Sequence, residues 1–245
     1  MRLLLIVLVA AVLASMAAAC SHSSSPAKYE GIYVSLGDSV AAGNGASDKA
    51  STSFAALLAK DEGGLQLVNL AVAGNTTTDV IEKQLPQIDA AAASRKIAFI
   101  AISIGGYDLA ALIPNATCQQ DPLPASCPLD EALASVERNL DQIMRALRMQ
   151  HADTPIVLLL YPNFFSGTGH VFEAPAARVL PRLDDVIARV AARYPHTAAA
   201  DAAPAFDGNG RTLTRVLDPQ FDPHPNDAGH RLIANAFEEA LKHTR

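Results

Sequence analysis

The sequence predicts a three-layer α/β/α domain with a central parallel sheet of five strands, from three observations. Five apolar runs recur along the chain, and two of them, residues 97–103 and 156–161, consist almost entirely of apolar side chains. Such runs are typical of strands buried on both faces, as in a parallel sheet covered by helices. Helical patterns separate the runs, and strands that alternate with helices favour right-handed crossovers.

The individual elements follow from the spacing of apolar residues along the chain. The predicted strands are Ile32–Leu36, Leu67–Ala71, Ile97–Ser103, Ile156–Tyr161 and a weaker run at Thr197–Asp201. The predicted helices are Ser51–Lys60, Thr78–Ala92, Asp130–Gln150, Ala174–Arg193 and Asp227–Lys242. The helix at 130–150 is the clearest, because its apolar residues recur at spacings of three and four and acidic residues stand at its amino end.

The first residues have the pattern of a secretory signal: an uncharged apolar run after a single arginine, ending in three alanines. Cys20 follows directly, which resembles a bacterial lipoprotein signal, although Ala17 stands where such signals usually carry leucine. The expected divisions are a signal peptide at 1–19, a lipidated Cys20 with a flexible tether at 20–28, and one domain at 29–245. The resemblance implies secretion across the inner membrane and a lipid anchor on Cys20 in the cell envelope. Ordinary cleavage that leaves the Cys20 thiol free stays the alternative.

The other two cysteines, Cys118 and Cys127, lie in the turn-rich segment Pro114–Pro128, which predicts a loop. We expect them to form a disulfide, because they are an even pair once Cys20 carries lipid and a cell envelope keeps them oxidised. A metal site is not expected there, since the segment has no histidine and no CxxC spacing. The net charge is −6 with scattered basic residues, so a nucleic-acid partner is not expected either.

The segment Gly37-Asp38-Ser39-Val40 directly follows the first predicted strand. A strand that ends in Gly-Asp-Ser places the serine on a tight turn at the carboxyl edge of the sheet, where open α/β sheets bind their ligands. A serine hydroxyl there becomes a nucleophile for acyl transfer if a base reaches it. Alternatively, Ser39 only caps the next helix.

His224 stands between Pro223 and Pro225, immediately before the last predicted helix. The two prolines restrict the backbone and present the imidazole on a rigid loop. Imidazole titrates near neutral pH, so a rigidly held histidine suits the general base of a serine nucleophile. Alternatively, the segment is a helix-entry loop with Asn226 as its N-cap.

Four segments together resemble the sequence blocks of the SGNH/GDSL hydrolase family, in the family's order. They are Leu36–Ser39, Asn69–Gly74, Ser103–Asp108 and His224–Asn226. The resemblance implies a flavodoxin-like α/β fold with Ser39 as nucleophile and His224 as base. It also implies an oxyanion hole from the backbone N–H groups of Ser39 and Gly74, and it implies no metal or organic cofactor.

The third block departs from the family pattern at Tyr107, where the family has an asparagine that donates to the oxyanion. Loss of one such donor typically lowers turnover by about a hundred- to a thousandfold. The phenol of Tyr107 or the side chain of Asn75, which directly follows Gly74, are the possible substitutes in the sequence. We expect Tyr107 to contact the substrate.

The last block departs at Phe221, where the family has the aspartate that orients the catalytic histidine. Asp222 lies one residue closer to His224 and is our candidate for this role. The alternatives are Asp218, which lies six residues before His224, and a backbone carbonyl. Each of these is physically possible, because the third member of a triad mainly orients the imidazole.

Together these features predict a secreted or envelope-anchored serine esterase or lipase. The expected partner is a small-molecule, lipid or acylated-polysaccharide ester, with the loops Pro114–Pro128 and Asn163–Pro175 shaping its pocket. One alternative is a binding lipoprotein that keeps the fold and has lost catalysis, which Tyr107 and Phe221 favour. A second alternative is an acyltransferase. The sequence leaves the acyl-chain length and the oligomeric state open.

Overall fold

The computed structural model describes residues 29–244. The predicted signal peptide at 1–19, the predicted lipidation of Cys20 and the predicted tether at 20–28 lie outside the described residues. Among the helices that are described, none combines the length and the apolar character needed to cross a membrane.

Five parallel strands form one sheet in the order β2-β1-β3-β4-β5. In chain order they are β1 (Ile32–Gly37), β2 (Gln66–Asn69), β3 (Ile97–Ser103), β4 (Ile156–Leu160) and β5 (Thr197–Asp201). Every residue of β1 and β3 is buried, which explains why these two strands have almost no polar side chains. The predicted fold class is confirmed, and the strand order is the flavodoxin-like one.

The second strand ends at Asn69 rather than at the predicted Ala71, because the Asn69 side chain closes a turn. Its Oδ1 accepts a hydrogen bond from the Ala71 N–H at 3.0 Å. Its Nδ2 donates to the carbonyl of Ala41 at 2.9 Å. The same amide therefore joins the loop after β2 to the loop after β1.

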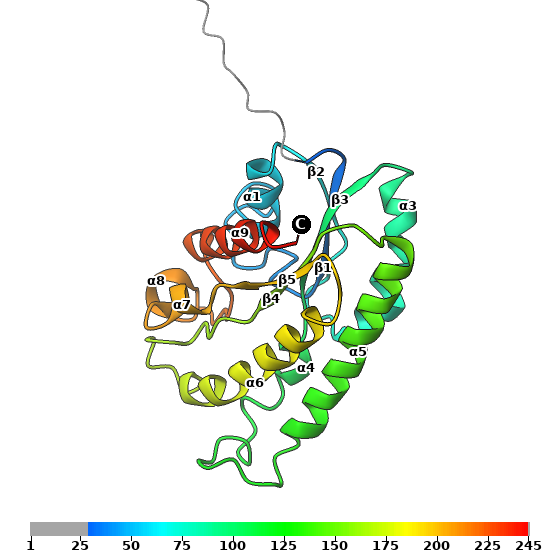
Figure 1. The fold of residues 1–245 in the computed structure, drawn as a ribbon. Coiled ribbons are helices and arrows are strands. Elements are labelled where there is room, and N and C mark those ends of the chain that lie inside the picture. Colours follow the sequence, from blue (N-terminus) through cyan, green and yellow to red (C-terminus); the bar gives the residue numbers. More distant parts are fainter. Residues whose placement is uncertain (1–28, 245) are drawn as a thin grey trace, which may run out of the picture.

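Helices cover both faces of the sheet (Figure 1). On one face α1 (Phe54–Asp61) packs against α9 (Asp227–Leu241). On the other face lie α3 (Ile88–Ala92), α5 (Leu129–Gln150) and α6 (Glu173–Ala191). The apolar stripe of α5 that the sequence predicts is the buried one, since Leu133, Val136 and Leu140 all face the core.

The single helix predicted at 78–92 is wrong, because the segment is divided into four short pieces. They are α2 (Thr77–Asp79), the π-turn η1 (Val80–Gln84), the 3-10 turn η2 (Leu85–Gln87) and α3. Pro86 lies in η2 and has no N–H to donate to the preceding turn, so a regular α-helix cannot run through it. The short helices α4 (Gly106–Leu109), α7 (Ala203–Phe206) and α8 (Gly210–Leu213) were not predicted, since one turn shows no apolar periodicity.

The order of the strands places a crevice at the carboxyl ends of β1 and β3. The chain runs from β1 outward to β2 and then returns to β3 on the other side of β1. The loops after β1 and β3 therefore leave the sheet in different directions, and ligands of such sheets bind at this point. Ser39 follows β1 and Tyr107 follows β3 at this crevice.

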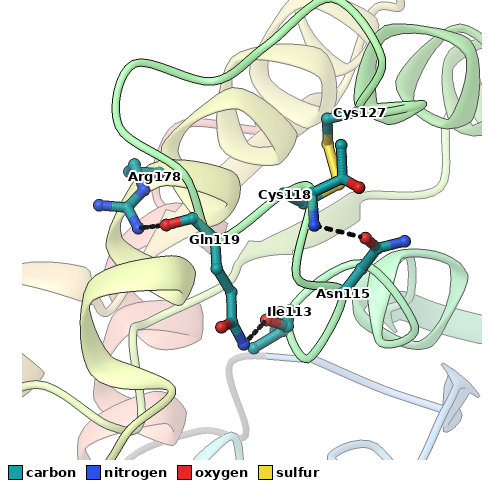
Figure 2. Close-up of a disulfide and its surroundings, with 7 residues drawn as sticks. Ile113, Asn115, Cys118, Gln119, Cys127 and Arg178 are labelled. Carbon is teal, nitrogen blue, oxygen red and sulfur yellow. Dashed lines mark hydrogen bonds between the residues drawn. A yellow bond between two sulfur atoms is a disulfide. The ribbon is translucent and has the colours of Figure 1, made fainter.

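The loop between α4 and α5 carries a disulfide between Cys118 and Cys127, which are nine positions apart (Figure 2). The Gln119 side chain donates to the carbonyl of Ile113 at 3.2 Å. Arg178 of α6 donates to the carbonyl of Gln119 at 2.7 Å. The loop is thus closed on itself and attached to α6, which fixes the position of its first residues near the crevice.

His230 of α9 is fully buried and links three segments around the crevice. Its Nδ1 accepts a hydrogen bond from the Phe54 N–H at the start of α1, at 3.2 Å. Its Nε2 lies 2.9 Å from the carbonyl of Asn44, in the loop after β1, and donates to it. Because both nitrogens are used by a neutral ring, a second proton would displace the Phe54 N–H. Burial lowers the pKa of His230 to about 4.

The neutral state of His230 predicts a loss of stability in acid. Between pH 6.5 and about 4 the unfolded chain binds a proton on this residue and the folded chain does not, so the free energy of unfolding falls by about 3 kcal/mol. Equilibrium denaturation of the wild type and of His230→Gln, measured across this range, should show that the variant lacks this part of the pH dependence. His243→Gln, on an exposed residue just after the same helix, should keep it. An equal slope in the wild type and in His230→Gln would contradict the assignment.

Candidate active site

The turn after β1 and the loop before α9 come into direct contact at Gly45. A Cβ atom on Gly45 would lie 2.2 Å from the carbonyl oxygen of Pro225 and 2.8 Å from Cβ of His224. The backbone of Gly45 also has a φ of +86°, which favours glycine. Only glycine allows the two loops to approach this closely, and the approach brings Ser39 and His224 together.

Ser39, His224 and Asp222 form a continuous hydrogen-bonded series. His224 Nε2 lies 2.7 Å from Ser39 Oγ. His224 Nδ1 is hydrogen-bonded to Asp222 Oδ1 on its other side. All three side chains are partly buried, so they are shielded and still reachable from the crevice. The arrangement can remove a proton from the serine hydroxyl while the carboxylate stabilises the resulting imidazolium.

The loop that carries His224 is held by its backbone on both sides. The His224 carbonyl accepts from the Arg215 N–H at 2.9 Å, and the Asn226 N–H donates to the Leu213 carbonyl at 2.9 Å. Asn226 also caps α9, because its Oδ1 accepts from the N–H groups of Ala228 and Gly229. The sequence offered two interpretations of this segment, a helix cap at Asn226 and a base at His224. In the structure Asn226 caps α9 and His224 contacts Ser39, so the first does not exclude the second.

The other acidic candidate, Asp218, is directed to a different partner. Its carboxylate lies 3.3 Å from the Arg215 guanidinium, and both side chains are about half exposed. Phe221, at the position where the family has its aspartate, stacks on His170 with 5.0 Å between the ring centroids. The one-residue shift from Phe221 to Asp222 is thus absorbed by the proline-containing loop.

The backbone N–H groups of Ser39 and Gly74 have no hydrogen-bond partner within residues 29–244. On either side of Ser39 the N–H groups are engaged, since Asp38 donates to the Ser103 carbonyl at 2.9 Å and Val40 donates to Asp38 Oδ1 at 3.0 Å. A free N–H beside a nucleophile is available to a developing oxyanion.

Tyr107 lies over Gly74 at the mouth of the crevice. A Cβ atom on Gly74 would stand 3.8 Å from Tyr107 Cζ, which places the phenol end of the side chain near the free N–H. The Tyr107 side chain is half exposed. Asn75 is buried, and its Oδ1 has no partner among the described residues.

A polar contact that the sequence did not predict fixes the loop containing Gly74. Asp108 accepts hydrogen bonds from the Thr77 N–H and, at 2.6 Å, from the Thr77 hydroxyl. Asn139 of α5 donates to the same hydroxyl at 2.9 Å. Burial raises the pKa of Asp108, and the Thr77 donors act in the opposite direction. These hydrogen bonds join the segment Ser103–Asp108, which contains Tyr107, to the loop that follows Gly74.

The crevice opens into a pocket of about 550 Å³ with mainly apolar walls. Its walls come from the loop after α4, through Ile113 and Pro114, and from the loop after β4, through Phe164, Phe165 and Phe172. Phe221 adds a half-exposed ring at its rim. Of the two segments that we expected to shape the pocket, Asn163–Pro175 supplies three aromatic rings, and Pro114–Pro128 supplies its first residue, Pro114.

Two buried residues that contact the segment just before Ser39 were also not predicted. The Gln84 amide bonds both the N–H and the carbonyl of Gly37, each at 2.8 Å. The Tyr161 hydroxyl donates to Asp38 Oδ2 and lies 3.1 Å from Ser103 Oγ. Asp38 is almost completely buried, and burial raises its pKa to about 7. Among the described residues, no group of three or more histidine, cysteine or acidic side chains is arranged to hold a metal ion.

The family model of the GDSL-like lipase/acylhydrolase family matches residues 35–232. The chain therefore belongs to this family, and it is a carboxylic ester hydrolase of the SGNH/GDSL type.

Particular relatives agree with this assignment. A lipase from Streptomyces rimosus is 28% identical over 221 residues, which cover 83% of this chain and 74% of the relative. The crystal structure of the extracellular lipase from the same organism has a TM-score of 0.66 at 25% identity, covering 86% of this chain and 100% of that one.

Two further solved structures show the same fold. Phospholipase A1 from Streptomyces albidoflavus gives a TM-score of 0.67 at 24% identity, covering 86% of this chain and 99% of that one. An acetylxylan esterase from Geobacillus stearothermophilus gives 0.61 at 20% identity, covering 88% and 95%.

Proposed function

We propose that the chain is a serine esterase or lipase that works through an acyl-enzyme on Ser39. The observation that carries the proposal is the 2.7 Å approach of His224 Nε2 to Ser39 Oγ, with Asp222 on the opposite ring nitrogen. This is the arrangement that nucleophilic catalysis by serine requires.

In the proposed reaction His224 takes the proton of Ser39 as its Oγ attacks the ester carbonyl. The carbonyl oxygen becomes an oxyanion, and the free N–H groups of Ser39 and Gly74 stabilise it. The C–O bond to the alcohol then breaks, and the imidazolium gives its proton to the leaving alkoxide. Water repeats these steps on the acyl-enzyme, which releases the carboxylic acid and restores Ser39.

The walls of the pocket support an ester with a hydrocarbon acyl or alcohol group. Ile113, Phe164, Phe165 and Phe172 offer no charged group to a polar substrate, and burial of apolar substrate surface against them is favourable. Tyr107 contacts the substrate at the mouth of the pocket, which its half-exposed position over Gly74 supports. The relatives named lipase and phospholipase A1 support a lipid ester, and the one named acetylxylan esterase supports an acetylated polysaccharide.

Export of the chain, the lipid on Cys20 and the oxidised state of Cys118 and Cys127 belong to the same proposal. The signal-like residues 1–19 and the position of Cys20 support export and anchoring. The extracellular lipase from Streptomyces rimosus supports secretion.

A fluorophosphonate probe tests the proposed nucleophile directly, because its phosphorus forms a covalent bond with an activated serine. We expect the folded wild type to be labelled, and mass spectrometry of its peptides should place the adduct on Ser39. Ser39→Ala should lose both the label and the hydrolysis of p-nitrophenyl esters while it keeps its unfolding midpoint. Ser47→Ala, a matched change on an exposed serine of the same loop, should keep both. Folded wild type that takes no label would favour a binding protein that has lost catalysis.

A further inference from the structure

Tyr161 lines the pocket beside the nucleophile turn and is fixed at both of its ends. It is the first residue after β4, and its side chain is buried. Its backbone N–H donates to Asp184 Oδ1 of α6 at 2.6 Å. Its hydroxyl donates to Asp38 Oδ2 and contacts Ser103 Oγ at 3.1 Å. The residue therefore connects α6 and β3 to the residue that directly precedes Ser39.

The space for this ring depends on a glycine. A Cβ atom on Gly106 would lie only 2.6 Å from Tyr161 Cε1, so a side chain at that position would displace the ring. Glycine at position 106 thus leaves the room that the Tyr161 ring needs to reach Asp38 with its hydroxyl.

Asp38 is held at four atoms, and Tyr161 supplies one of the four contacts. Its N–H donates to the Ser103 carbonyl, and its own carbonyl accepts from the Ala42 N–H, each at 2.9 Å. Its Oδ1 accepts from the Val40 N–H at 3.0 Å, and its Oδ2 accepts from the Tyr161 hydroxyl. Within residues 29–244 no Lys, Arg or His side chain forms an ion pair with Asp38. The buried carboxyl therefore depends on these neutral donors for its position.

These contacts fix the peptide that joins Asp38 to Ser39. That peptide carries the Ser39 N–H, which is free, and it sets the direction of the Ser39 side chain toward His224. A shift of about 1 Å in a reacting group can reduce turnover by about a hundredfold. We expect the loss of one of the two side-chain contacts of Asp38 to permit a shift of this kind.

We propose that Tyr161 is a positioning residue for the nucleophile: its hydroxyl holds the Asp38 carboxyl, and the carboxyl holds Ser39 in line with His224 and with the oxyanion. The inference rests on the proposed function, since it needs Ser39 to be the nucleophile. It predicts an effect of Tyr161 on turnover that does not pass through substrate binding.

The test is Tyr161→Phe, which removes the hydroxyl and keeps the ring. We expect kcat for p-nitrophenyl esters to fall about 10- to 100-fold, with KM within about twofold of the wild type. The rate of fluorophosphonate labelling of Ser39 should fall by a similar factor. Tyr194→Phe is the matched control, because the Tyr194 hydroxyl donates to Asp141 at 2.7 Å beyond the far end of α6. It should leave kcat, KM and the labelling rate unchanged.

A double-mutant cycle separates this role from general destabilisation. If Tyr161 acts through Asp38, then Asp38→Asn should lower kcat as well, and the double variant should be no slower than the slower single variant. Additive losses, an unchanged kcat in Tyr161→Phe, or a loss confined to KM would each overturn the inference. If Tyr161→Phe does not fold, Ser103→Ala, which removes the second hydroxyl contact, should lower kcat by a smaller factor, and an unchanged kcat would overturn the inference.

The labelling of the wild type distinguishes a failure of this inference from a failure of the proposed function. Wild type that takes no fluorophosphonate label contradicts the assignment of Ser39. Labelled wild type with an equally fast Tyr161→Phe contradicts only the positioning role.

Discussion

Replacing His224 by glutamine is expected to lower kcat for ester hydrolysis by about 10⁵-fold or more, with little change in KM. The imidazole lies 2.7 Å from Ser39 Oγ. His230, in α9, is not available as a substitute, since it is buried and hydrogen-bonded to Phe54 and Asn44. In serine hydrolases the loss of the base costs about as much as the loss of the whole triad. Steady-state kinetics with p-nitrophenyl esters, at enzyme concentrations high enough to detect the residual rate, measure the effect.

The control for this variant is His243→Gln, because His243 is exposed and interacts only weakly with Glu239 at 3.8 Å. Its kinetics should match those of the wild type. A His224→Gln variant that keeps more than about a tenth of wild-type kcat would contradict the role of His224 as base.

Asp222→Asn is expected to lower kcat by about 10²- to 10⁴-fold. An asparagine can present an N–H to the imidazole instead of an acceptor, which favours the wrong tautomer and removes the charge that stabilises the imidazolium. The contact of Asp222 with His224 Nδ1 is the physical basis of this prediction.

Asp218→Asn is the matched variant, because it makes the same chemical change in the same loop. Asp218 pairs with Arg215 in a half-exposed position, so its kcat should stay within a few-fold of the wild type. A strong loss in Asp218→Asn, or no loss in either variant, would show that another group orients His224. Kinetics of the two variants at one pH thus distinguish the three possibilities that the sequence leaves open.

The sheet was predictable because its strands differ sharply from the rest of the chain. Strands that are buried on both faces need apolar residues at every position, and β3 and β4 show such runs. The segment from Thr77 to Ala92 was not predictable in detail, since its apolar residues have helical spacing and the interruption depends on Pro86. Gln84, in the π-turn, contacts Gly37, which lies 47 positions earlier, and no local pattern predicts such a contact.

The nucleophile and the base were predictable because short blocks carry them, although Ser39 and His224 are 185 positions apart. The residues that support them were not. The sequence predicts Tyr161 only as the last apolar residue of a strand, and the folded chain shows that its hydroxyl donates to Asp38. Buried polar contacts of this kind join residues that are far apart in the sequence, so no local sequence pattern predicts them.

The direction of β1 has a practical consequence for attaching the protein to a surface. The strand begins at Ile32 and delivers Ser39 beyond its other end, and a strand of this length spans roughly 20 Å. Any link made ahead of Tyr29, whether a lipid, an affinity tag or a bead, joins the domain at the edge of the sheet opposite to the pocket. A protein immobilised through that side presents its pocket to the free solution, and one coupled through the loops around Phe221 covers it.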